Sequence, residues 1–270
     1  MLSFLLYDIK RSHTVTRTAH ERYTNLIRRF SPLTPFNLVT TLRRLQQVTQ
    51  IHHRRFDCCS NSCMAFTEST NDHCLICLAP RYDKSGNPVQ TFDYIPLLHR
   101  LRLQYSSASR ADILTTYPEQ CTAKYKASGV ITDIWDGKLL QELRERGLFM
   151  NKSDISLSFH TDGVKLFKSR QSFHVWPLLM IINNLPPDQR FKKENVLLLG
   201  VIPGPNQPKD LDSFLRPLID ELKDLQAGVS RVFNGSTREY FTLHAYVCTI
   251  GEKPLACFHE AYLLISGCRC

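Results

Sequence analysis

The chain has 270 residues, with 34 Lys and Arg against 25 Asp and Glu, so its formal net charge is +9. Hydrophobic residues make up 43% of it and charged residues 22%, which is typical of a globular chain and excludes a disordered, collagen-like or coiled-coil protein. The length allows one large domain or two of modest size.

Apolar runs in the sequence are short. None reaches the roughly 18 residues of a membrane-spanning helix. Residues 2–7 are apolar, but no basic flank precedes them and no small-residue cleavage site follows, so they do not resemble a secretory signal. We therefore expect no membrane association and a reducing compartment.

The positive charge is concentrated at the start of the chain. Residues 1–56 contain ten Lys and Arg against two acids, which is +8 of the +9. Apolar residues at helical spacing in residues 20–50, interrupted by Pro32 and Pro35, predict two short helices. A solvated helical surface would explain the charge, but the neighbouring cysteine-rich segment favours a basic arm that contacts nucleic acid.

Five of the ten cysteines lie within twenty residues. Cys59, Cys63, Cys74 and Cys77 form two knuckles, C-x3-C and C-x2-C, with ten residues between them. Two such knuckles can place four thiolates tetrahedrally around Zn²⁺, so residues 57–82 are predicted to bind a structural zinc. Four thiolates leave no open position for water, which argues against a catalytic zinc.

Other ligand sets and other cysteine chemistry remain open for this segment. Cys58 could replace Cys59, and His73 could replace Cys74. Free core thiols are a further alternative, as are disulfides, although disulfides are typical of secreted proteins.

The rest of the chain changes from helical to strand-like patterning near residue 154. Residues 106–150 are predicted to be helical. Strands are expected at residues 155–162, within 173–183, at 196–202 and at 240–250, the last apolar on both sides like a central parallel strand. A helix with Asp212 or Ser213 as its N-cap and Gly228 at its end separates the last two strands, so this half is α/β.

Asp162 ends the polar face of the first of these strands and precedes Gly163. From the residues alone, Asp-Gly after a strand most often forms a turn. A catalytic role for Asp162 is suggested only by a wider resemblance of the sequence, described next.

Several stretches resemble the CACTA-type (En/Spm) DNA transposases, especially their fungal branch. They cover roughly residues 56–256 and follow the family's order. The similar stretches are FDCCSNSC at 56–63, CLIC at 74–77, PRY at 80–82, TFDYIP at 91–96, DIWDG at 133–137, TDG at 161–163, NLPP at 184–187, KENVLLLGVIPG at 193–204 and PKDLDSF at 208–214.

The resemblance implies a ribonuclease-H-like catalytic domain, in which three acids bind two divalent metal ions, Mg or Mn, that promote attack on DNA phosphodiesters. It assigns Asp162 to the first acid and Glu252 to the second, which follows the helix and the next strand. For Glu252 a solvated turn is the alternative. No residue matches the third acid, and residues 268–270, CRC, replace the family's second C-x-x-C knuckle.

We therefore expect an α/β fold with an incomplete ribonuclease-H-like mixed sheet, preceded by a helical and zinc-ribbon-like N-terminal region. The expected segments are a basic helical arm at 1–56, a four-cysteine zinc-binding segment at 57–82, a mostly helical linker region at 83–152 and a partial catalytic core at 153–270.

The expected function is that of a truncated or decayed cut-and-paste DNA transposase in the nucleus, which binds DNA but does not cleave or join it by itself. DNA contacts are expected from the basic arm, from Arg100 and Arg102, and from Lys192 and Lys193; self-association is possible. The alternative is a non-catalytic, zinc-dependent module that binds nucleic acid or protein.

Overall fold

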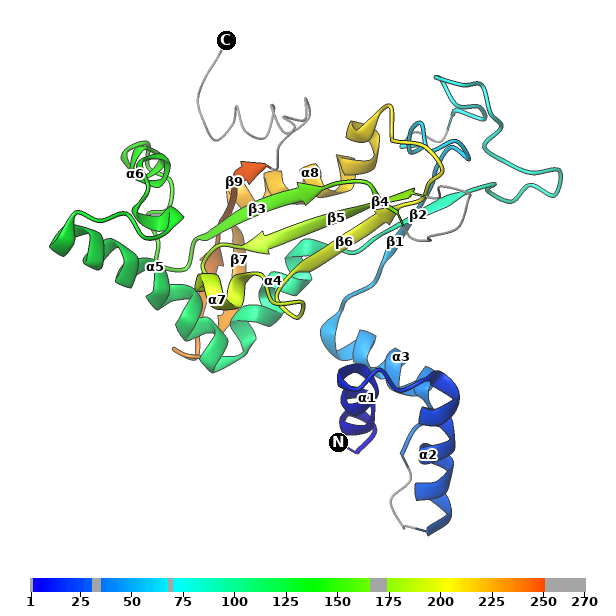
Figure 1. Cartoon of the computed structure of the whole chain (residues 1–270), viewed down its shortest axis with the longest axis horizontal. Coiled ribbons are helices and arrows are strands. Elements are labelled where there is room, and N and C mark those ends of the chain that lie inside the picture. The colour runs from blue at the N-terminus through cyan, green and yellow to red at the C-terminus, as the bar shows by residue number, and fades with distance from the viewer. Residues whose placement is uncertain (1, 31–34, 68–69, 166–173, 251–270) are drawn as a thin grey trace. The chain divides into compact units, whose positions relative to one another are not determined.

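The computed structural model of the protein describes residues 2–30, 35–67, 70–165 and 174–250 (Figure 1). The chain divides into two compact units, residues 1–52 and residues 53–270. They are named unit 1 and unit 2 below.

Unit 1 consists of three helices that contact one another: α1 (Leu2–Ser12), α2 (Arg17–Phe30) and α3 (Leu38–Thr49). The backbone N–H of Phe36 donates to Ser3 Oγ at 2.8 Å and connects the start of α1 to the segment before α3. Asn37 caps α3 by accepting from the Thr40 N–H. The two helices predicted within residues 20–50 are confirmed. α1 lies within the expected helical arm, although no separate helix was predicted at this position.

Unit 2 is built on a mixed sheet. In its described part the strand order is β1-β2-β6-β5-β3-β9, and β4 pairs with β5. β3 and β6 are antiparallel to β5, whereas β9 is parallel to β3. The strands are β1 (Arg54–Asp57), β2 (Thr91–Tyr94), β3 (Ile155–Thr161), β4 (Val164–Lys165), β5 (His174–Ile182), β6 (Leu197–Ile202) and β9 (Ala245–Ile250).

Helices and a separate hairpin complete unit 2. The hairpin pairs β7 with β8 and is not part of the main sheet. These elements are α4 (Leu97–Ser106), α5 (Ala108–Ser128), the 3-10 helix η1 (Ile134–Asp136), α6 (Lys138–Glu145), α7 (Pro187–Arg190), α8 (Leu211–Ala227), β7 (Val229–Asn234) and β8 (Glu239–Leu243).

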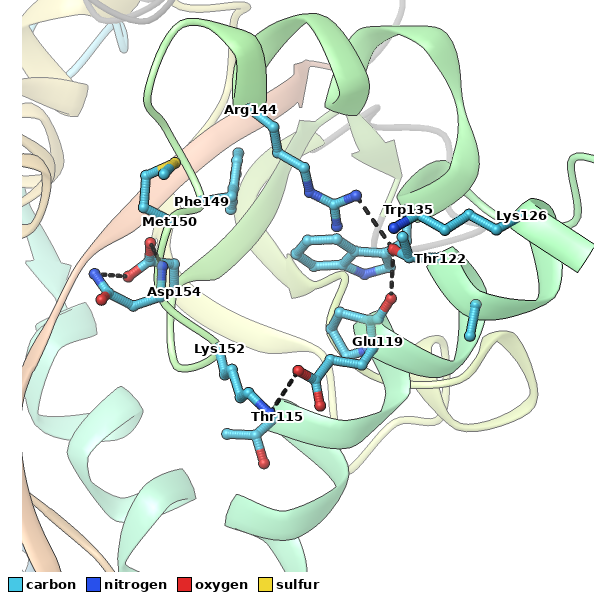
Figure 2. Close-up of a pocket in the computed structure, with 13 residues that line it drawn as sticks. Thr115, Glu119, Thr122, Lys126, Trp135, Arg144, Phe149, Met150, Lys152 and Asp154 are labelled. Atoms are coloured by element: carbon cyan, nitrogen blue, oxygen red, sulfur yellow. Dashed lines mark hydrogen bonds and ion pairs between the residues drawn. The ribbon is translucent and has the colours of Figure 1, made fainter.

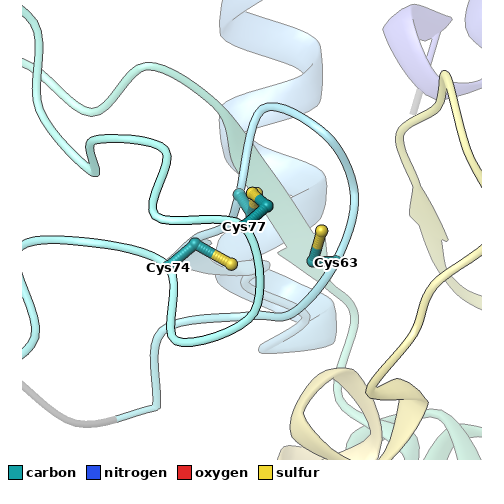
Figure 3. A group of neighbouring side chains, drawn as sticks. Cys63, Cys74 and Cys77 are labelled. Atoms are coloured by element: carbon teal, nitrogen blue, oxygen red, sulfur yellow. The ribbon is translucent and has the colours of Figure 1, made fainter.

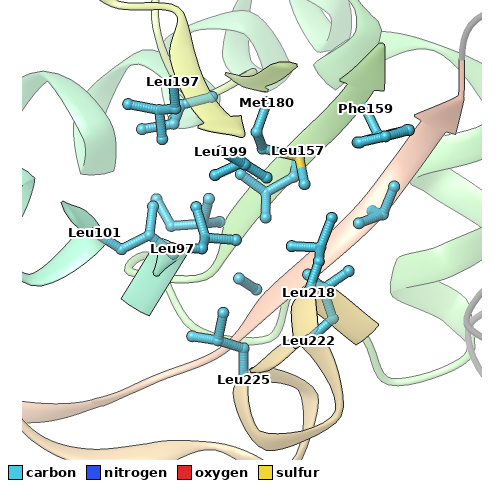
Figure 4. Packing of buried hydrophobic residues seen from close by; sticks show 14 of the residues in the cluster. Leu97, Leu101, Leu157, Phe159, Met180, Leu197, Leu199, Leu218, Leu222 and Leu225 are labelled. Carbon is cyan, nitrogen blue, oxygen red and sulfur yellow. The ribbon is translucent and has the colours of Figure 1, made fainter. Parts of the chain in front are cut away.

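The main core lies between the sheet and helices α4 and α8 (Figure 4). Leu97 of α4 and Leu218 of α8 meet Leu157, Met180 and Leu199 from three neighbouring strands, and all five are fully buried. Each buried side chain of this kind contributes roughly 1.5–3 kcal/mol of hydrophobic free energy. The helical spacing of apolar residues in α8 therefore fixes which face of this helix lies on the sheet.

A glycine allows the β1–β2 ribbon to join this sheet. β2 contacts β6 through the pair Tyr94 and Gly200. A Cβ at Gly200 would lie 2.6 Å from the ring of Phe92 and 2.9 Å from the Asp93 carbonyl oxygen. The close approach of β2 to β6 thus requires glycine at this position.

The α/β architecture with a mixed sheet is confirmed, but one predicted strand is two. Residues 240–250 form β8 and β9, which are separated at His244, because the chain changes its partner there from β7 to β3. β9 is parallel to its neighbour, as predicted, but in the described residues it is the last strand of the sheet and not a central one.

The boundaries of the predicted helix need one correction. The N-cap of α8 is Asp210, whose side chain accepts from the Ser213 N–H, and not Asp212 or Ser213. Gly228 is the C-cap, as predicted. The division of the chain into four segments stays a prediction.

Candidate functional site

Four cysteine side chains lie together in residues 57–82. The Sγ atoms of Cys59, Cys63, Cys74 and Cys77 are all within 4.8 Å of one another. Those of Cys59 and Cys77 are 3.4 Å apart. Figure 3 shows Cys63 on one loop and Cys74 and Cys77 on another, with their side chains gathered in the same region. These four residues are close enough to share one metal ion.

Each knuckle is a tight turn held by its own backbone. The Ser62 N–H donates to the Cys59 carbonyl oxygen at 2.8 Å, and the Leu78 N–H donates to the Cys74 carbonyl oxygen at 2.9 Å. Ser62 and Leu78 have φ angles of 62° and 59°. Non-glycine residues in this left-handed region cost free energy, of order 1–3 kcal/mol each, so the surrounding contacts must hold both turns.

Backbone N–H groups also point at two of the sulfur atoms. Asn61 N–H donates to Cys59 Sγ at 3.3 Å, and Ile76 N–H donates to Cys74 Sγ at 3.4 Å. In each knuckle the donor lies two residues after its cysteine. Hydrogen bonds to sulfur favour the thiolate, which is the form that binds a metal.

The thiols differ in their proton affinity. Burial raises the pKa of the Cys63 thiol to about 12 and also raises the pKa of Cys59. Cys77 is less buried and accepts from Asn61 Nδ2 at 3.4 Å, which lowers its pKa to about 6. A divalent cation among the four sulfurs would favour deprotonation of all of them, because coordinating thiols lose their protons.

The two alternative ligands, Cys58 and His73, do not belong to this group of four side chains. The Cys58 side chain is only 1% exposed and packs in the main core, where Cys58 forms a β-bridge with Ala65. His73 is exposed and forms a β-bridge with Pro80. The geometry therefore favours Cys59 over Cys58 and Cys74 over His73.

The donor set suits zinc. Four closely spaced thiolates match the tetrahedral sulfur coordination that structural Zn²⁺ sites use, and they leave no ligand position for water. The cluster could therefore hold a metal ion such as zinc in a structural role.

The first knuckle is attached to the start of α8. The Cys63 carbonyl oxygen accepts from the N–H groups of Lys209, at 3.1 Å, and Asp210, at 2.8 Å. The Ala65 N–H donates to Ser213 Oγ at 2.9 Å. The cysteine segment thus contacts the helix that covers the core of unit 2.

Asp162 follows β3 directly and is exposed. Its Oδ1 accepts from the Gly163 N–H at 2.7 Å. A Cβ at Gly163 would lie 3.0 Å from Trp176 Nε1, so this turn packs closely on β5. Because Ile250 of β9 pairs with Phe159, Asp162 lies at the edge of the sheet where both parallel strands end.

The second predicted acid, Glu252, lies outside the described residues, as do residues 268–270. In the part of the chain that the structure describes, the four cysteines are the one group of three or more His, Cys, Asp or Glu side chains close enough to share a metal. Asp162 does not belong to such a group there.

The polar face of β3 has a structural role that the sequence did not reveal. Ser156 and Ser158 are buried. Ser158 Oγ donates to Asn183 Oδ1 at 3.0 Å, and Asn183 Nδ2 donates to Ser156 Oγ at 3.1 Å. The alternation of polar and apolar residues along β3 therefore marks a buried hydrogen-bond network, and the exposed Asp162 lies beyond it, after the end of the strand.

The DIWDG stretch belongs to the same buried region. Asp133 and Arg190 form an ion pair at 2.9 Å with side chains only 2% and 7% exposed. Trp135 Nε1 donates to the carbonyl oxygen of Asn183, which also accepts from Arg190. Sequence reasoning missed this role because the partners come from distant segments.

The basic residues predicted to contact DNA lie in different environments. Arg100 is partly buried and donates to the Leu198 carbonyl oxygen at 2.6 Å, and Arg102 is partly buried with its Nε unpaired. Exposed cations are more suitable for phosphate contacts. They include Arg22, Arg29 and Arg43 in unit 1 and Lys192 and Lys193 in unit 2.

Among the helices described, none has the length and apolar character needed to cross a membrane.

Comparisons with known proteins bear on residues 136–267. No curated protein matches the chain. Residues 136–267, which include Asp162 and the strands from β3 to β9, match the family described as Transposase family tnp2. This chain is therefore similar to a transposase family over these residues, which supports a transposase-related function.

Proposed function

We propose that this protein is a DNA-binding, transposase-related protein of the CACTA type, of the fungal branch, which acts on DNA in the nucleus. The observation that carries the proposal is the match of residues 136–267 to a transposase family. Its core in unit 2 is a ribonuclease-H-like sheet.

The arrangement of the sheet supports this core. The resemblance puts one acid on the first strand and another after the helix and the next strand. These strands are β3 and β9, which are parallel neighbours in the sheet. In the chain, α8 and the β7–β8 hairpin come directly before β9. Since parallel neighbours end at the same edge of a sheet, this edge is where a site for a bound substrate is expected in such a fold.

Two kinds of metal have different roles in the proposal. Asp162 and Glu252 form a partial acidic site for Mg²⁺ or Mn²⁺, ions that in the complete sites of the family activate water and a DNA 3′-hydroxyl for attack on phosphodiesters. In this chain alone the partial site does not support catalysis. Cys59, Cys63, Cys74 and Cys77 bind a zinc ion that stabilises the fold. Their mutual distances and the sulfur donor set support this second role.

DNA binding is assigned to the basic helices of unit 1. Residues 1–52 contain eight Lys and Arg against two acids. Arg22 and Arg29 are exposed and lie seven residues apart on α2, which puts them on one face of this helix. Such a face can neutralise neighbouring phosphates and release their counterions.

The test is the salt dependence of DNA binding, measured by fluorescence anisotropy with a labelled duplex between about 50 and 200 mM salt. Over this range about six to ten phosphate contacts would lower the affinity by roughly 10³–10⁵. The affinity of the full chain should fall linearly on a logarithmic plot. The double variant Arg22→Gln/Arg29→Gln should bind more weakly, with a slope smaller by about 0.9 for each phosphate that the variant no longer neutralises.

The matched control removes two exposed charges from unit 2, in Lys84→Gln/Lys223→Gln. It should keep the slope of the unmodified chain. A salt-independent affinity, or equal losses in the two double variants, would contradict the assignment to unit 1. The alternative of a non-catalytic binding module has no observation that favours it.

A further inference from the structure

A pocket of about 450 Å³ lies in unit 2 beside α5, α6 and the segment that follows α6 (Figure 2). Its volume is within the usual range for small-molecule sites, roughly 300–1,000 Å³. Trp135 and Phe149 form part of its wall, and the basic side chains around it are Lys126, Arg144 and Lys152. It does not include Asp162 or the cysteine cluster.

Arg144 is held in a defined orientation at this pocket. Its guanidinium carbon lies 5.6 Å from the centre of the Trp135 ring, and its Nη1 donates to Thr122 Oγ1 at 3.2 Å (Figure 2). One face of the guanidinium is therefore supported by the indole, and one of its five N–H donors is used by the hydroxyl.

Arg144 is partly buried, yet no carboxylate pairs with it among the residues that the structure describes. Burial lowers the pKa of its guanidinium. Arg190, in the neighbouring network, is compensated by Asp133 at 2.9 Å. A partly buried cation without a counter-charge is stabilised when an external anion binds beside it.

The acids that line the pocket already have partners. Asp154 is buried, accepts from the Asn151 N–H at 3.0 Å and lies 3.3 Å from His244 Nδ1. Glu119 pairs with Lys152 at 2.8 Å, but the two side chains are 49% and 72% exposed, so this ion pair is weak and Lys152 can exchange it for another anion.

A second cation is available from α5. Lys126 lies four residues after Thr122 on this helix, so it is on the same face. Its side chain is exposed and lines the pocket with Arg144. The pocket thus combines an oriented guanidinium with an adjacent ammonium group.

We propose that this pocket is a phosphate-binding site, with Arg144 as the principal ligand and Lys126 as the second. A guanidinium presents N–H donors in the planar geometry that phosphate oxygens accept, and an ammonium adds a point charge. The volume also accommodates a nucleoside attached to the phosphate. A free nucleotide and a DNA strand are the two possible sources of the group, and the site does not depend on the function proposed above.

Isothermal titration calorimetry on the full chain tests the proposal with inorganic phosphate, deoxyadenosine monophosphate and a short single-stranded oligonucleotide. All three should bind, and Arg144→Gln should weaken the binding of phosphate and of the nucleotide at least about tenfold, as the loss of one charge-assisted hydrogen bond predicts. Arg146→Gln, an exposed charge two residues away, should leave both affinities unchanged.

Further variants separate ligand loss from misfolding. Arg144→Lys keeps the charge and should retain part of the affinity. Lys126→Gln should weaken binding, and Lys124→Gln, also exposed on α5, should not. If the Arg144→Gln loss extends to the oligonucleotide, DNA is supported as a source; if it is confined to the nucleotide, a free nucleotide is supported.

Two results would overturn the phosphate site. One is the absence of binding of inorganic phosphate and nucleotide to the unmodified chain. The other is an equal effect of Arg144→Gln and Arg146→Gln. Neither result would affect salt-dependent DNA binding through Arg22 and Arg29, so failure of this site and failure of the proposed function can be told apart.

Discussion

Cys58 and Cys59 are adjacent in the sequence, but their side chains lie in different surroundings. Burial in the main core raises the pKa of the Cys58 thiol to about 12, so it stays protonated at neutral pH. Cys59 faces the other three cysteines and accepts a backbone N–H at its sulfur. The direction of the side chain, and not the spacing in the sequence, decides which of the two can bind a metal.

This difference predicts the metal content of two variants. Cys59→Ser should lose bound zinc, because serine is a poor replacement for a thiolate ligand. Cys58→Ala should keep zinc, although a buried side chain is shortened and the protein unfolds at a lower temperature. The measurement is zinc per chain by elemental analysis of the purified variants. If Cys59→Ser retained zinc and Cys58→Ala lost it, the assignment would be contradicted, and Cys58 rather than Cys59 would be the ligand.

At the scale of elements, α8 depends on the cysteine segment. Ser62 Oγ donates to the Pro203 carbonyl oxygen at 2.6 Å, and Cys63 accepts from two N–H groups just before the helix. These interactions come from a cysteine of the cluster and from the residue directly before it. Metal binding should therefore order both the knuckle and the loop between β6 and α8.

Removal of the metal should show this coupling. After chelation, amide hydrogen exchange should become faster in residues 203–213, above all at Lys209 and Asp210, because the Cys63 carbonyl oxygen that accepts from their N–H groups is no longer held in place. Exchange in β5, whose partners are β3 and β6, should change less and serves as the internal control. Equal acceleration in both segments, or none in residues 203–213, would show that these interactions do not depend on metal.

At the scale of the whole molecule, charge and candidate chemistry lie in different units. Unit 1 carries eight Lys and Arg against two acids, whereas residues 53–270 carry 26 against 23. Arg54 and Arg55, which belong to the basic block of the sequence, lie in β1 of unit 2, and Arg55 pairs with Asp93. DNA binding and strand chemistry can therefore be tested separately.

DNA cleavage is also tested on the whole polypeptide, and we expect that this polypeptide does not cleave DNA by itself. The resemblance requires three acids, and it assigns only two of them in this sequence, Asp162 and Glu252. The measurement is nicking of supercoiled plasmid in Mg²⁺ or Mn²⁺. Nicking that is abolished by Asp162→Ala and kept in Asp224→Ala, an exposed acid on α8, would contradict this expectation.

Local patterns predicted the elements that are governed by local forces. The apolar spacing of α8 and the glycine at its end indicated a helix that the structure confirms, with its N-cap corrected to Asp210. The break at His244 could not be predicted, because residues on both sides of it are strand formers and only their partners differ. The ion pair of Asp133 with Arg190 could not be predicted either, because its two residues are far apart in the chain.

The sequence by itself determined the four-cysteine pattern, the basic start of the chain, the α/β order of its second half and the resemblance to transposases. These features depend on residue identity and short spacing. The tertiary structure decided that Cys59 and not Cys58 faces the cluster, that the polar residues of β3 are buried, and that Arg144 faces a pocket without a carboxylate partner in the described residues. Such choices depend on which distant segments pack together, because burial and charge compensation are set by neighbours in space.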